Sequence, residues 1–316
     1  MKKVSILSRT FNEEGNIRSF YERVTKVMEQ FPQYDYEILI ADNCSQDETV
    51  DILRDIAAND NKVKVILNAK NFGISRSSRY IRQFYTGDCV ISMASDLQDP
   101  PEIIAELLRH WEDGKKMVVA VKSGSEESIV MRTIRKLYYR IVNAISSVEQ
   151  INDYGFMLVD KSIMDKLMPC FLPGTYGRGL YAEYGYDIAT VSFIKPKRKH
   201  GKSSFNFFSY FDVMMMAVTY TSKTPIRIAT LAGLFLSILS FLIAAVYFIL
   251  RIFWWPNPPW GIGPLLVGMF FFASVQILFL GLIGEYVAAI LAKVTPKPLV
   301  MVREYINFDN DEINNE

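Results

Sequence analysis

Apolar runs of strand length alternate with segments of helical spacing along residues 1–120. The runs lie at 4–7, 36–41, 63–67, 88–93 and 117–121, and the helical segments at 16–30, 46–57, 74–85 and 101–111. A strand and a helix differ in the period at which apolar residues recur. Strands that alternate with helices are typical of a mostly parallel sheet with right-handed crossovers. The pattern therefore predicts an α/β domain in this part of the chain.

Two later stretches, 228–250 and 262–284, contain no charged residue. About 20 apolar residues cross a bilayer as a helix, and a helix buried in a soluble core is rarely apolar on all sides for so long. The connection between the stretches, 254–261, is uncharged and carries three tryptophans, a residue type enriched at membrane interfaces. We therefore expect a two-helix transmembrane hairpin.

Basic residues set the expected orientation of the hairpin. Most lie on the sides that face the two termini: Lys223, Arg227, Lys293, Lys297 and Arg303. The positive-inside rule then predicts an integral protein of the cytoplasmic (inner) membrane, with the α/β domain and both termini in the cytoplasm. Arg251 is the exception, and its long side chain can reach the outer interface. Residues 1–20 are polar, and we expect no secretory signal there.

These patterns divide the chain into four segments: an α/β domain at 1–200, juxtamembrane amphipathic helices at 201–225, two transmembrane helices at 226–294 and a cytoplasmic tail at 295–316. Residues 203–222 are rich in Phe, Tyr and Met, so we expect helices in the membrane interface. A buried amphipathic helix of the α/β domain is the alternative. Residues 132–147 have helical apolar spacing and predict a further helix.

Composition limits the classes of function and the kinds of metal site to be expected. A net charge of +1 argues against a nucleic-acid-binding protein. The three cysteines, Cys44, Cys89 and Cys170, are scattered, which indicates a reducing compartment and argues against a zinc site. Because the chain has only two histidines, we expect any metal to be held by oxygen.

The most informative motif is the acidic segment 95–102, Ser-Asp-Leu-Gln-Asp-Pro-Pro-Glu, which follows the fourth predicted strand. Ligands of open α/β sheets bind beyond the carboxyl ends of the strands. Asp96, Gln98 and Asp99 place hard oxygen donors there, and such donors suit Mg²⁺ or Mn²⁺. The alternative is a solvated turn before a helix whose first turn is acidic.

Polar residues also follow each of the other central strands. They lie at 10–16, at 42–47 and at 68–73. Four polar ends on one rim predict a nucleotide pocket, in which Asp42 accepts a hydrogen bond from a base N–H and Phe11 packs on the base. Each residue also has a simpler structural explanation: Asn12 and Asp47 as helix caps, and Glu13 as a first-turn acid.

Seven motifs in order carry a resemblance to a known family. They are 11–14 (Phe-Asn-Glu-Glu), 42–47 (Asp-Asn-Cys-Ser-Gln-Asp), 96–102, 137–143 (Leu-Tyr-Tyr-Arg-Ile-Val-Asn), 178–180 (Arg-Gly-Leu), 198–203 (Arg-Lys-His-Gly-Lys-Ser) and 284–286 (Gly-Glu-Tyr). On these the chain resembles the family-2 glycosyltransferases with the GT-A fold. It is most similar to the branch that moves sugars onto polyprenyl phosphate, which includes bactoprenol glucosyltransferases and dolichol-phosphate mannosyltransferases.

The resemblance implies a Rossmann-like GT-A catalytic domain and a set of site residues. The implied nucleotide-sugar contacts are Thr10, Phe11, Glu13, Asp42, Asn71 and Asp96, and the implied metal ligands for Mg²⁺ or Mn²⁺ are Asp96 and Gln98. The implied contacts to the phosphates of acceptor or donor are Arg178, Arg198, Lys202 and Ser203. A juxtamembrane basic patch on anionic lipid is the alternative for the cluster at 195–202.

Three departures from the family pattern bear on catalysis. The family's Asp-x-Asp reads Ala-Ser-Asp here, so Ala94 stands in place of the first acid and leaves Asp96 as the catalytic carboxylate. Arg9 stands where a proline is common, and nothing in the sequence explains it. The loop expected to read Gly-Asp-Phe-Arg reads Asn-Asp-Tyr-Gly-Phe-Met at 152–157. We assign Asp153 as the catalytic residue that faces the acceptor; a structural turn cap is the alternative.

Together these features predict an inverting, metal-dependent glycosyltransferase. The expected donor is a UDP-sugar and the expected acceptor is undecaprenyl phosphate, for cell-surface glycan synthesis or modification, with self-association of the membrane helices. One alternative is a membrane glycosyltransferase that acts on a lipid-linked oligosaccharide or another glycolipid. The other is a non-catalytic nucleotide-sugar-binding subunit, which the missing first acid suggests.

Overall fold

The computed structural model describes residues 1–124, 154–171, 175, 177–196, 224–253, 262–295 and 297–313. Several predictions lie outside these residues. They are the helix at 132–147, the interfacial helices at 203–222, and the site residues Asp153, Arg198, Lys202 and Ser203.

Four parallel strands form the centre of the sheet, in the order β4–β1–β2–β3. They are β1 (Lys2–Thr10), β2 (Tyr34–Asp42), β3 (Val63–Asn68) and β4 (Cys89–Ala94). Each matches an apolar run in the sequence, because strands buried on both faces of a parallel sheet are apolar throughout. The structure confirms the predicted α/β fold with a Rossmann-like, mostly parallel sheet of the GT-A type.

The sheet is wider than the sequence pattern predicts. Beside β4 lie β6 (Tyr154–Asp160), β5 (Met117–Gly124) and β7 (Ile188–Ile194), with β6 antiparallel to both of its neighbours. At the other edge, β8 (Val302–Ile306) pairs antiparallel with β3. Only β5 was predicted among these four strands. The C-terminal segment thus returns to complete the sheet of the α/β domain, and it ends in a short helix, α11 (Asn310–Ile313).

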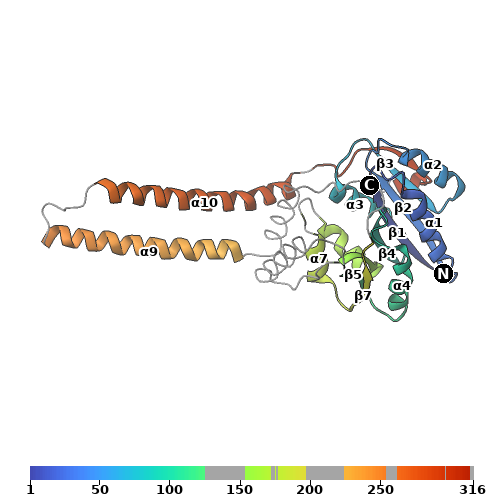
Figure 1. Cartoon of the computed structure of the whole chain (residues 1–316), viewed down its shortest axis with the longest axis horizontal. Helices are drawn as coiled ribbons and strands as arrows, with labels where there is room; N and C mark the ends of the chain where they lie inside the picture. The colour runs from blue at the N-terminus through green and yellow to red at the C-terminus, as the bar shows by residue number, and fades with distance from the viewer. Residues whose placement is uncertain are drawn as a thin grey trace.

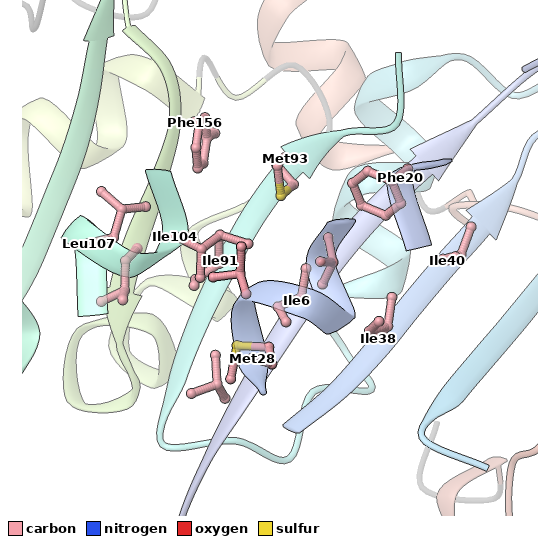
Figure 2. Close-up of a cluster of buried hydrophobic side chains, with 14 of the residues drawn as sticks. Ile6, Phe20, Met28, Ile38, Ile40, Ile91, Met93, Ile104, Leu107 and Phe156 are labelled. Carbon is pink, nitrogen blue, oxygen red and sulfur yellow. The ribbon is translucent and has the colours of Figure 1, made fainter. Parts of the chain in front are cut away.

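Helices cover the two faces of the sheet. The first face carries α1 (Ile17–Met28), α2 (Thr49–Asn59) and the turn η1 (Pro101–Ile103) with α4 (Ile104–Glu112). Ile6, Ile38 and Ile91 of the strands meet Phe20 and Leu107 of these helices in a dry core (Figure 2). The second face carries α3 (Ile74–Ile81), α6 (Lys161–Leu167), η2 (Met168–Cys170) and α7 (Gly177–Tyr184).

Two long helices, α9 (Thr224–Phe253) and α10 (Ile262–Val294), extend side by side away from the sheet (Figure 1). Along the long axis of the molecule, α3 and α7 lie nearer to this pair than α1, α2 and α4 do (Figure 1). Both long helices are apolar and long enough to cross a membrane, and none of the apolar windows at Ile226–Ile243 and Gly268–Val294 is buried inside the protein. The predicted pair of apolar helices is therefore confirmed by length and composition.

Candidate functional site

The carboxyl ends of the four central strands meet at one edge of the sheet. In the strand register Thr10 lies beside Asp42, and Arg9 lies beside Ala94. Thr10 is buried, whereas Phe11 is 37% exposed at the rim. The structure thus brings the polar segments that follow these strands to one place, as the α/β pattern requires.

Asp42 is a fully buried carboxylate at the end of β2. It accepts hydrogen bonds from the backbone N–H of Ser45 at 3.0 Å and from the Ser45 hydroxyl at 2.5 Å. Burial raises the pKa of Asp42, and the bonds from Ser45 only partly offset this. The Ser45 oxygen also accepts from the backbone N–H of Asn12 at 2.9 Å, which joins the loops after β1 and β2.

The loop after β1 is held by its own side chains. Asn12 has a left-handed backbone, with φ of 53°, and its side-chain oxygen accepts from the backbone N–H of Gln46 at 2.8 Å. Glu13 is buried and accepts from the side-chain amide of Asn16 at 2.6 Å. Asn12 therefore bridges two loops and does not cap a helix. Asp47 accepts from the backbone N–H of Thr49 at 3.1 Å, but the N-cap of α2 is the next residue, Glu48, so Asp47 is not the cap.

A network of amides fixes the loop that leads into α3. Asn71 accepts from the side-chain amide of Asn43 at 2.8 Å and from the backbone N–H of Gly73 at 2.9 Å. The Asn43 oxygen accepts from Asn68 at 3.2 Å and from Ser77 at 3.0 Å. Asn71 is predicted to contact the ligand, whereas Asn43 is not among the predicted site residues, although it directly follows the strand β2.

The acidic motif begins directly after β4. The Asp96 carboxylate is partly exposed and accepts from the backbone N–H of Gln98 at 3.1 Å, around a left-handed Leu97 with φ of 58°. Ser95 is buried and donates to the carbonyl oxygen of Arg9 at 3.1 Å. The turn therefore presents Asp96 at the edge of the sheet and fixes its backbone to β1.

Asp99 differs from Asp96 in its surroundings. It is buried, and this burial raises its pKa despite the nearby positive charges of Lys122 and Arg9. Gly155 of β6 packs against it so closely that a Cβ at this position would lie 2.6 Å from a carboxylate oxygen of Asp99. Asp99 is thus packed inside the protein, beneath the exposed part of the motif.

The donor set of the motif is compatible with a divalent cation. Within the described parts of the chain, no three His, Cys, Asp or Glu side chains gather as a metal site. Mg²⁺, however, is commonly held by one or two carboxylates together with substrate phosphates and water. The carboxylate of Asp96 and the side-chain carbonyl of Gln98 fit such a site, in which a diphosphate supplies further oxygens.

Arginines adjoin the acidic motif on the face of the sheet covered by α3 and α7. Arg9 is only partly exposed, and its burial lowers its pKa; the charges of Arg82, Asp99, Asp96 and Arg178 also act on it. Arg178, predicted to contact phosphate, therefore lies on the same side of the sheet edge as Arg9. Arg82, which follows α3, was not singled out in the sequence.

Comparison with known proteins identifies the family to which the chain belongs. The family model described as glycosyl transferase family 2 matches residues 5–168. The uncharacterized glycosyltransferase YkcC of Bacillus subtilis is 27% identical over 311 residues, covering 98% of this chain and 96% of that protein. The bactoprenol glucosyl transferase of Shigella phage SfII is 29% identical over 304 residues, covering 96% and 98%.

Among solved structures, glucosyl-3-phosphoglycerate synthase from Mycobacterium tuberculosis in complex with UDP is similar. Its TM-score is 0.49 at 18% identity, and the match covers 69% of this chain and 80% of that chain. The family model, which spans more than half of the sequence, decides the classification. The chain is a glycosyltransferase and belongs to glycosyl transferase family 2.

Proposed function

We propose that this glycosyltransferase moves a sugar from a UDP-sugar to undecaprenyl phosphate at the cytoplasmic face of the membrane. The observation that carries the proposal is the union, in one chain, of a family-2 site with two helices apolar and long enough to cross a bilayer. The similarity to a bactoprenol glucosyl transferase along nearly the whole chain supports the same acceptor class.

The donor nucleoside binds at the ends of β1 and β2. The buried carboxylate of Asp42 is suited to accept from a base N–H, and the exposed ring of Phe11 is suited to pack on the base. Thr10, Glu13 and Asn71 complete this part of the pocket. The bonds among Asp42, Ser45 and Asn12 hold the two loops in place before the donor arrives.

The diphosphate binds at the acidic motif. Asp96 and Gln98 are the residues that would hold Mg²⁺ or Mn²⁺, and such an ion would supply positive charge to the departing nucleoside diphosphate. Asp96 is partly exposed at the edge of the sheet, so its carboxylate is accessible to a ligand there. Ala94 contributes no ligand.

The acceptor is an anionic nucleophile already at pH 7, so it needs less help from a general base than an alcohol does. Asp153 faces this acceptor, and Arg178, Arg198, Lys202 and Ser203 position its phosphate. A single in-line displacement at the sugar carbon inverts its configuration. Such a displacement needs no covalent nucleophile from the protein.

The membrane hairpin brings the lipid to the site. The helices α9 and α10 cross the cytoplasmic membrane, with the catalytic domain and both termini in the cytoplasm, and self-association of the hairpin gives a homo-oligomer. The glycolipid product then serves the synthesis or modification of cell-surface glycans.

The test uses membranes that contain the protein, Mn²⁺ or Mg²⁺, undecaprenyl phosphate and a panel of radiolabelled UDP-sugars. We expect a labelled lipid that carries one sugar and is labile to mild acid. Product that forms only with a lipid-linked oligosaccharide would replace the proposed acceptor. Binding of a UDP-sugar without transfer to either lipid would favour a non-catalytic subunit.

A further inference from the structure

Three arginines from separate elements gather on the face of the sheet covered by α3 and α7. Arg9 lies two residues after Leu7, which belongs to the hydrophobic core of that face, and alternate strand residues share a face. Arg82 directly follows α3, and its guanidinium lies 5.1 Å from the centre of the Phe171 ring. Phe171 packs on Tyr181 of α7 at 5.6 Å, one helical turn from Arg178.

The hydrogen-bonding state of this cluster is incomplete. The Nε atom of Arg82 is buried, and it has no hydrogen-bond partner in the described part of the chain. A buried guanidinium donor without an acceptor is costly, and a bound anion removes that cost. The planar fork of arginine suits the oxygens of a phosphate group.

The charges around the cluster also favour an anion. The positive charges of Arg82 and Arg178 act on Arg9, and so do the negative charges of Asp99 and Asp96. Ala94, the cross-strand neighbour of Arg9, adds no acid, whereas an aspartate at this position would partly neutralise Arg9.

We propose that Arg9 and Arg82 join Arg178 in a phosphate-binding site on the face that carries α3 and α7. The inference rests on the proposed function and extends it, since the phosphate belongs either to the lipid acceptor or to the donor diphosphate. The lipid phosphate is the better match, because this face lies nearer to α9 and α10 than the opposite face does (Figure 1). Arg9 and Arg82 are then positioning residues that hold one substrate.

The test is binding without turnover, measured by titration calorimetry on the full chain in detergent micelles. Geranyl phosphate is the soluble probe for the lipid phosphate, UDP with Mn²⁺ is the probe for the donor, and geraniol is the uncharged control. The variants are Arg82→Gln, Arg9→Gln and Arg82→Lys. Arg18→Gln is the matched control, because Arg18 is an exposed arginine on α1 that pairs with Asp55 at 2.6 Å.

We expect Arg82→Gln and Arg9→Gln to weaken geranyl phosphate binding about 10-fold or more, since a hydrogen bond to a charged group is worth at least about one factor of ten. UDP binding stays within about 2-fold, which also shows that the variants fold. Arg82→Lys is intermediate, because it keeps the charge and loses the fork. Arg18→Gln binds both probes as the wild type does.

Weakened UDP binding with unchanged geranyl phosphate binding would assign the site to the donor diphosphate and overturn the lipid assignment. Unchanged binding of both probes in both glutamine variants would refute the assignment of Arg9 and Arg82 to a phosphate-binding site. If Arg82→Gln does not fold, the binding measured with Arg9→Gln decides whether the arginines bind phosphate. A wild type that binds geranyl phosphate through Arg82 but forms no glycolipid would refute the proposed function and leave the site standing. Glycolipid synthesis by the wild type, together with unchanged geranyl phosphate binding in the variants, would support the proposed function and refute the phosphate-binding site.

Discussion

The strand β2 carries two buried carboxylates, Glu37 in its first half and Asp42 at its last residue, and their surroundings differ. Glu37 is 1% exposed and accepts from the Ser5 hydroxyl at 2.5 Å and the backbone N–H of Thr86 at 2.8 Å, and it pairs with Lys3 at 2.9 Å. Burial alone would raise its pKa, but these partners outweigh burial and lower the pKa of Glu37.

Asp42 is buried as deeply but has fewer partners. Ser45 and the backbone of Cys44 donate its hydrogen bonds, and burial outweighs these bonds and raises its pKa. One strand therefore holds a carboxylate that pairs with a lysine and a carboxylate whose hydrogen bonds come from neutral groups of the loop that follows it. The first stabilises the fold, and the second lies where a substrate binds in a parallel sheet.

The largest expected effect is a loss of glycosyl transfer without a loss of stability, on substitution of Asp96 at the same edge of the sheet as Asp42. Asp96→Asn should lower glycosyl transfer by at least about 100-fold, because it removes a charge that supports the leaving diphosphate. The thermal unfolding midpoint should stay close to that of the wild type, since Asp96 is partly exposed. The measurement is transfer of labelled sugar to lipid, with the exposed Asp113→Asn as the control. Full activity in Asp96→Asn would refute its assignment as metal ligand.

The second-largest expected effect is a loss of stability on substitution of Glu37, in the first half of β2. Glu37→Gln should lower the free energy of unfolding by about 2 kcal/mol, because it removes the charged acceptor of Lys3 and of two hydrogen bonds. Asp42→Asn should cost less stability and weaken UDP binding instead. Urea unfolding and UDP titration of both variants test this comparison. Equal losses of stability with equal UDP affinity would show that the two carboxylates have the same role.

The pH dependence of stability should follow the same contrast. The folded pKa of Glu37 lies below its ordinary value of 4.5, so its contribution is fully present above pH 4.5 and is lost as the pH falls through the folded pKa. The raised pKa of Asp42 has the opposite sign, because protonation removes the cost of burying its charge. Between pH 5 and the folded pKa, we expect Glu37→Gln to lose less stability on acidification than the wild type does. A steeper loss in the variant would contradict this.

The smallest effect concerns the attachment of β8 to the sheet. Glu304 of β8 accepts two hydrogen bonds from Arg54 of α2, at 2.8 and 2.5 Å, but both side chains are exposed. Glu304→Gln should therefore cost less than about 1 kcal/mol. Urea unfolding measures the change, and a loss of several kcal/mol would show that this pair, and not the backbone pairing with β3, holds the strand.

Local sequence determined much of this protein. The apolar runs of the central strands, the helical spacing between them and the two long uncharged stretches are recognisable because their periods and lengths are set within each segment. The acidic motif was predictable for the same reason, since the end of β4 fixes where Asp96 lies. The family motifs added the assignment of roles, which geometry alone does not supply.

Tertiary structure decided the rest. The strand β8 pairs with β3, more than 230 residues earlier in the chain, and no local pattern encodes such a partner. The opposite pKa shifts of Glu37 and Asp42 depend on Ser5, Thr86 and Lys3, which come from other segments. The gathering of Arg9, Arg82 and Arg178 has the same origin. Burial and charge at a residue are properties of its neighbours in space, and only the folded chain specifies those neighbours.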